Sequence, residues 1–88
     1  MVSADGLAIL GLNAGETVRW RAGDGTRWHT GRVTGRERDG SIGVIDARGL
    51  SRSFPVERLE VRCAGPRGGA AWEALCERAS RTEQLRLL

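Results

Sequence analysis

The stretch from Glu16 to Asp46 decides the fold of this chain, and it reads ETVRWRAGDGTRWHTGRVTGRERDGSIGVID. Apolar and polar residues alternate within it in short runs, and glycine or aspartate closes each run. Val18 and Trp20, for example, fall on one face of a strand, while the residues that flank them fall on the other. A period of two with glycine-rich breaks is typical of short β-strands joined by tight turns, and it assigns Trp20 to a core.

The same pattern continues beyond this stretch and predicts five strands in all. We expect strands at residues 16–21, 27–34, 41–46, 51–54 and 59–62, and one helical turn at 56–58. Gly31 lies inside the second strand, which indicates a bulge or a close approach of another backbone. Residues 35–40 form a charged hairpin connection, because the Asp39-Gly40 pair readily adopts positive backbone angles.

The two flanks of this region differ from it in composition. Residues 1–14 are apolar but interrupted by glycine, and they are left unassigned between a loose arm, a short extra strand and an unstructured start. Residues 63–69 contain Gly-Pro-Arg-Gly-Gly, which predicts a hinge that ends the β region.

Residues 70–88 are rich in helix formers and have no internal glycine or proline, so we expect a helix there. Trp72, Leu75, Cys76 and Ala79 give it an apolar stripe that packs on the sheet. The Ser80 to Glu83 stretch matches a capping box, which leaves open whether one helix continues or a second begins.

Ten residues of the β region carry a family resemblance: Val18, Trp28, Gly31, Val33, Gly40, Val44, Asp46, Gly49, Pro55 and Leu59. With five short strands and a helical turn before the last, they resemble the SH3-like small-barrel group, especially Tudor-like and KOW-like modules. The resemblance implies a five-stranded barrel over residues 15–62. The expected fold is therefore mainly β, with a C-terminal α-helical extension over residues 70–88. Methyl-lysine-reading Tudor modules need an aromatic cage, and this chain has no tyrosine and one phenylalanine. That activity is not carried over.

The residue types that enzymes need are scarce in this chain. His29 is the single histidine, expected to be an exposed or edge-strand residue, and the two cysteines lie in separate segments. A metal site needs three or four converging ligands, and nucleophilic catalysis needs a base beside the nucleophile. We therefore expect no enzyme, no cofactor, no metal and no small-molecule substrate. Two cysteines without a signal peptide or membrane span predict a cytoplasmic protein with reduced thiols.

All fourteen basic side chains are arginines, and the net charge is +3. Two explanations stay open: recognition of phosphate or carboxylate by planar guanidinium groups, and a GC-rich coding bias. Residues 16–62 hold ten arginines against seven acidic residues, and so they carry the whole net charge. If the arginines cluster on one side, they predict binding of a DNA or RNA backbone, with a base stacked on Trp28 or Phe54. The residues of this predicted site are Arg19, Arg21, Arg27, Trp28, Arg36, Arg38 and Arg52.

A protein partner is the alternative to nucleic acid. The chain end is apolar where most termini are polar, and Leu85, Leu87 and Leu88 are its candidate contacts. An adaptor would bind its partner through the C-terminal helix or along a strand edge. A third interpretation assigns the arginines to a solvated surface of mixed charge.

Overall fold

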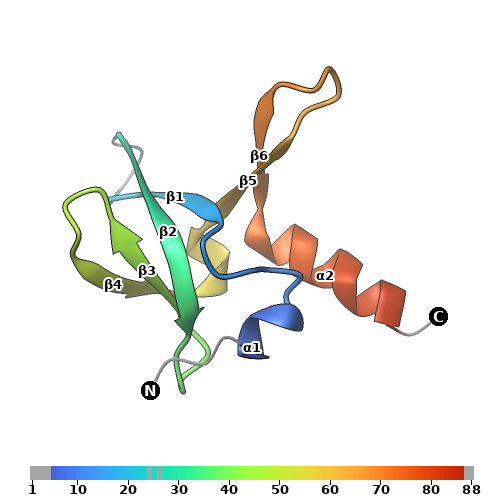
Figure 1. The fold of residues 1–88 in the computed structure, drawn as a ribbon, viewed down its shortest axis with the longest axis horizontal. Helices are drawn as coiled ribbons and strands as arrows, with labels where there is room; N and C mark the ends of the chain where they lie inside the picture. Colours follow the sequence, from blue (N-terminus) through green and yellow to red (C-terminus); the bar gives the residue numbers. More distant parts are fainter. Residues whose placement is uncertain (1–4, 24, 26, 87–88) are drawn as a thin grey trace.

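The computed structural model describes residues 5–23, 25 and 27–86, and this part of the chain is mainly β. One antiparallel sheet holds six strands in the order β4-β3-β2-β1-β5-β6. The strands are β1 (Thr17–Arg21), β2 (Trp28–Arg36), β3 (Ile42–Asp46), β4 (Ser51–Phe54), β5 (Glu60–Ala64) and β6 (Ala70–Ala74). The helices are α1 (Asp5–Ala8), the single 3-10 turn η1 (Val56–Arg58) and α2 (Leu75–Arg86). The hairpin of β5 and β6 projects away from the other strands, and α2 leaves from its base (Figure 1).

The first five strands and the helical turn lie where the sequence pattern predicts them, to within two residues at each end. The alternation also assigns the faces correctly, since Val18 and Trp20 are both buried. These short segments follow their pattern because a one-residue slip would turn every apolar side chain out to solvent.

The strand count differs from the prediction, because residues 70–74 form β6 and not the first turns of a helix. All five residues of β6 pair with β5, from Ala64 opposite Ala70 to Glu60 opposite Ala74. Helix propensity is a weak preference, and this pairing outweighs it. The expected hinge is therefore the connection of a hairpin, in which Gly68 has a φ of +80° and Cys63 belongs to β5. Beyond it, α2 runs without a break through Ser80, so no second helix starts at the capping-box sequence.

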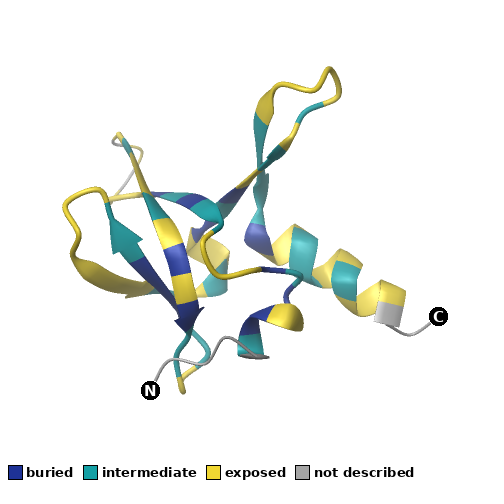
Figure 2. Cartoon of the chain, viewed as in Figure 1, coloured by how far each residue is buried: buried dark blue, intermediate teal, exposed yellow. Residues whose placement is uncertain are grey.

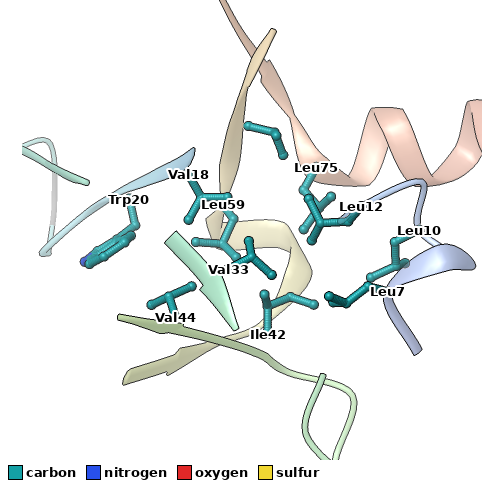
Figure 3. Packing of buried hydrophobic residues seen from close by; sticks show 11 residues of the cluster. Leu7, Leu10, Leu12, Val18, Trp20, Val33, Ile42, Val44, Leu59 and Leu75 are labelled. Atoms are coloured by element: carbon teal, nitrogen blue, oxygen red, sulfur yellow. The ribbon is translucent and has the colours of Figure 1, made fainter. Parts of the chain in front are cut away.

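The core gathers side chains from both ends of the chain and from the sheet between them (Figure 3). Leu7, Leu10 and Leu12 come from the segment that the sequence left unassigned, and each is at most 7% exposed. Leu75, at the start of α2, is fully buried in the same cluster, and Ala79 packs against it. The expected packing of the C-terminal helix is thus confirmed for these two residues, but it is wrong for Cys76, which is exposed, and for Trp72, which belongs to β6. Buried residues lie where the sheet, α1 and α2 meet, whereas the far end of the β5–β6 hairpin is more open to solvent (Figure 2).

Gly31 occupies a point where two neighbours leave no room for a side chain. A β-carbon there would lie 2.5 Å from the carbonyl oxygen of Ile45 and 2.9 Å from the Trp20 ring. The predicted close approach is therefore confirmed, and the irregularity of the β2–β3 register falls slightly later, between Val33 and Gly35.

Replacing Gly31 with alanine is expected to lower the free energy of unfolding by about 1–3 kcal/mol, because neither a backbone carbonyl nor a buried ring can move aside cheaply. Urea unfolding measures this loss. Gly69→Ala is the matched control, since a β-carbon at Gly69 meets nothing within 4 Å. Equal stability of the two variants would contradict the close packing at Gly31.

Candidate functional site

An open hollow of about 440 Å³ lies between the β1–β2 connection and the β3–β4 connection. We call it the arginine hollow, and its charged residues are Arg27, Arg48, Arg52 and Asp46. Trp20, Trp28 and His29 also line it. Three guanidinium groups and three aromatic rings thus meet around one open space.

The inner wall of the arginine hollow is aromatic. Trp20 and His29 are directly opposite each other on β1 and β2, and their rings stack with 6.4 Å between centroids. On its other side Trp20 contacts Phe54, at 4.7 Å between centroids. Trp20 is only 3% exposed, whereas His29 is exposed. A planar ligand that entered the hollow would therefore meet the imidazole of His29 before the indole beneath it.

Asp46 is the one carboxylate among the described residues that line the hollow, and both of its oxygens already accept hydrogen bonds. Oδ2 accepts a hydrogen bond of 2.8 Å from Nε of Arg52. Oδ1 accepts from the backbone N–H groups of Arg48 and Leu50, at 2.9 and 3.0 Å. The hydrogen bond from Arg52, followed by the one from Leu50, lowers the pKa of the Asp46 carboxyl below its ordinary value. Asp46 is therefore ionised at neutral pH, and it offsets one of the three arginine charges.

Arg27 and Arg48 are both exposed, and neither has an ion-pair partner within the described ranges 5–23, 25 and 27–86. Within those ranges, neither guanidinium group has a carboxylate to give up before it binds an anion. Planar guanidinium groups bind phosphate oxygens through paired hydrogen bonds. The hollow thus combines positive charge with an accessible ring.

Arg19 lies on the opposite face of the sheet and is held there by internal contacts. Its guanidinium carbon lies 3.9 Å from the Trp28 ring centroid and 4.6 Å from that of Trp72. It also donates two hydrogen bonds to Glu60, of 2.9 and 2.6 Å. Arg21 lies over Trp28 as well, at 4.2 Å. Arginine therefore covers much of Trp28, and a base could stack on this ring only where arginine leaves it open.

The structure does not bring all seven predicted binding residues together. Arg27, Trp28 and Arg52 line the arginine hollow, whereas Arg19 and Arg21 stack on the Trp28 ring and do not line the hollow. Arg36 is the last residue of β2 and Arg38 lies in the β2–β3 connection, so both are at the other end of β2. Successive connections of an antiparallel meander alternate between the two ends of the sheet. The hairpin at residues 35–40 therefore cannot close over the same hollow.

Arg36 has structural contacts at that other end. Its Nε donates to the carbonyl oxygen of Gly40 at 3.1 Å, and a terminal nitrogen donates to that of Gly6 at 3.4 Å. These bonds join the turn to α1. Arg38 is exposed within the turn and has no ion pair with any residue that the structure describes.

Arg48 and His29 belong to the hollow but not to the predicted set. Arg48 could have been predicted from the strand order. It lies in the third connection of a meander, the β3–β4 connection, which is at the same end of the sheet as the first connection and Arg27. His29 could have been predicted from the pairing of β1 with β2. Trp28 is opposite Arg21 on one face of the sheet, so the next residue, His29, is opposite Trp20 on the other face.

The remaining sequence candidates are placed as follows. Trp20 and Phe54 touch, and Trp20 and Trp28 both line the arginine hollow, but Phe54 does not, so these three rings do not line one hollow together. Leu85 is 66% exposed on α2. Leu87 and Leu88 lie outside the described residues.

Two kinds of feature are absent from the described part of the chain. No three side chains of histidine, cysteine, aspartate or glutamate come together there as metal ligands. No helix in that part is long and apolar enough to cross a membrane. Comparison with known proteins finds no family model, no curated protein and no solved structure that matches this chain.

Proposed function

We propose that this protein is a non-catalytic module that binds the phosphate backbone of DNA or RNA at the arginine hollow. Arg27 and Arg48 contact phosphates, and Arg52, whose charge Asp46 offsets, supplies further N–H donors. His29 supplies a ring on which a base can stack. Recognition is mainly electrostatic, because none of these groups is held rigidly against a position where it would read one particular base.

One observation carries this proposal: three arginines line an open space in which the one carboxylate among the described residues is already hydrogen-bonded to Arg52 and to its own turn. A surface of evenly mixed charge would place an acidic partner beside each arginine. Here two of the three arginines have no such partner among the described residues. Desolvation of phosphate in this hollow is therefore offset by charge-assisted hydrogen bonds.

We also propose that β1 to β5 are a variant of the SH3-like small barrel, with β6 and α2 added to it. The strand order β4-β3-β2-β1-β5 and the 3-10 turn η1 before β5 support this assignment. In this variant the arginine hollow lies between two connections at one end of the meander, and β6 lengthens the sheet beyond β5.

Affinity for single-stranded oligonucleotides is expected to fall steeply with salt. Each neutralised phosphate of a single strand contributes about −0.7 to the slope of log K against log salt concentration, so two or three contacts give about −1.4 to −2.1. A proton-nitrogen NMR titration with short DNA and RNA strands at several salt concentrations measures the slope and the location together. The largest shifts are expected at Arg27, His29 and Arg48.

Other outcomes of this titration point away from nucleic acid. Binding that does not change with salt would contradict the phosphate contacts. If neither nucleic acid shifts any signal at low salt, the adaptor alternative gains, and the exposed side of α2 around Leu85 becomes the surface to test with protein partners.

A further inference from the structure

A second hollow, of about 380 Å³, lies beside the arginine hollow on the opposite face of the sheet. We call it the outer hollow, and the side chains that characterise it are Thr17, Thr30, Arg32, Ile45 and Arg62. Thr17 is directly opposite Arg32 on the neighbouring strand, and Arg32 is opposite Ile45. Arg62 follows Val61, the partner of Val18, and so it reaches Thr17 from the other side. Two arginines therefore flank a threonine across three adjacent strands.

The outer hollow offers hydrogen-bond donors, and the one carboxylate among its described lining residues is already bonded elsewhere. Arg32 and Arg62 are both exposed, and neither forms an ion pair with any described residue. A terminal nitrogen of Arg32 makes only a long hydrogen bond, of 3.5 Å, to the carbonyl oxygen of Gly15. The threonine hydroxyls can donate as well. Asp46 is the acidic residue of the lining, and its oxygens are bonded to Arg52 and to its own turn.

The two hollows form one continuous surface, because Thr30, Asp46 and Ala47 line both of them. Ala47 is exposed and small, so no bulky side chain stands between the two sets of arginines at this point. The hollows nevertheless face different ways. Trp20 and His29 point to one face of the sheet, whereas Thr17 and Arg32 point to the other. A ligand that fills both must bend over the end of the sheet at Ala47.

We infer that the outer hollow is a second phosphate subsite for the ligand of the arginine hollow, and that this ligand is single-stranded nucleic acid. The inference rests on the proposed function and specifies that the nucleic acid is single-stranded. A DNA duplex has a persistence length of about 50 nm, whereas the longest extent of this protein is 40 Å. A duplex therefore cannot follow a surface that turns from one face of the sheet to the other. A single strand can, because its backbone rotates freely between phosphates.

The test compares two double variants with the unchanged protein. Arg32→Gln with Arg62→Gln removes the charge of the outer hollow, and Arg27→Gln with Arg48→Gln removes two charges of the arginine hollow. Both leave the same net charge, and all four residues are exposed, so unfolding midpoints are expected to stay unchanged. Binding is measured by fluorescence anisotropy with single strands of about 4 and about 16 nucleotides, a range that covers known single-strand site sizes.

The outer-hollow variant is expected to bind the longer strand about tenfold more weakly, a loss of about 1.4 kcal/mol. Its affinity for the shorter strand is expected to fall less than about threefold, because a short strand fills one hollow and retains the arginine hollow. The unchanged protein is expected to prefer the longer single strand about tenfold over a duplex of equal length, because the duplex reaches only one hollow.

The failures of the inference and of the proposed function can be told apart. If the arginine-hollow variant loses affinity and the outer-hollow variant does not, the second subsite is refuted and the proposed function stands. Equal or tighter binding of the duplex refutes the single-stranded ligand. If no strand of either length binds the unchanged protein at low salt, the proposed function itself fails.

Discussion

A chain that ends at Arg67 is expected to lose its cooperative unfolding transition. The truncation removes β6, all five residues of which pair with β5. It also removes Leu75, which is fully buried in the core. Loss of one buried leucine side chain costs about 2–5 kcal/mol, and native proteins of any size are stable by only about 5–15 kcal/mol. The shortened chain therefore has too little buried surface left to offset its conformational entropy. Thermal unfolding followed by near-ultraviolet circular dichroism checks this.

Ion pairs of Arg78 add to the effect of the truncation. This side chain is 14% exposed, and it bonds Glu16 at 2.8 Å as well as Glu73. It also donates to the carbonyl oxygen of Gly11, at 3.4 Å. Arg78 thus joins α2 to β6 and to the segment before β1. Truncation leaves Glu16 without this partner.

Two point variants separate core packing from chain length in this prediction. Leu75→Ala is expected to destabilise the whole protein by about 2–5 kcal/mol, since it opens a cavity in the core. Leu85→Ala on the same helix is expected to change stability by less than about 0.5 kcal/mol, because Leu85 is 66% exposed. A truncated chain that unfolds cooperatively at the same temperature as the full chain would show that β6 and α2 are not part of the core.

The sequence predicted the β region well because its information there is local. In β1 the buried Val18 and Trp20 alternate with less buried residues, each hairpin connection has its glycine, and Pro55 stops β4 where expected. Residues 70–74 were predicted as helix for the opposite reason. This segment reads Ala-Ala-Trp-Glu-Ala and does not alternate between apolar and polar residues. Its structure depends instead on pairing with a strand that begins ten residues earlier. Leu7, Leu10 and Leu12 pose the same difficulty, because only the assembled sheet and α2 give them a surface to cover.

The candidate site could be predicted in its residue type but not in its location. Arginine content pointed to an anion, yet the predicted set combined residues from both ends of the meander. Arg27 lies in the connection at one end, whereas Arg36, the last residue of β2, and Arg38, in the β2–β3 connection, lie at the other. Internal contacts were harder to foresee. Arg19 is bound by Trp28, Trp72 and Glu60, and Trp72 reaches it only because residues 70–74 are a strand.

Removing Arg27 and Arg48 together is expected to weaken binding of single strands about 100-fold. A hydrogen bond to a charged group contributes about 1.5 kcal/mol at the low end of its range, and two of them correspond to about 3 kcal/mol, or two powers of ten in Kd. The slope of log K against log salt is expected to become shallower by about 1.4, because two phosphate contacts are lost. Anisotropy titrations at several salt concentrations give both quantities from one set of samples.

The control for this prediction removes the same charge from another place. Arg38→Gln with Arg67→Gln changes two exposed arginines, one in the β2–β3 connection and one in the β5–β6 connection, and neither has an ion pair among the described residues. Its affinity is expected to fall no more than about threefold, since screening at moderate salt limits charge effects to about 10 Å. Equal losses in the two variants would mean that total charge alone attracts the strand. A large loss confined to Arg27→Gln with Arg48→Gln assigns binding to one end of the sheet, where two connections bring together residues that lie 21 positions apart in the chain.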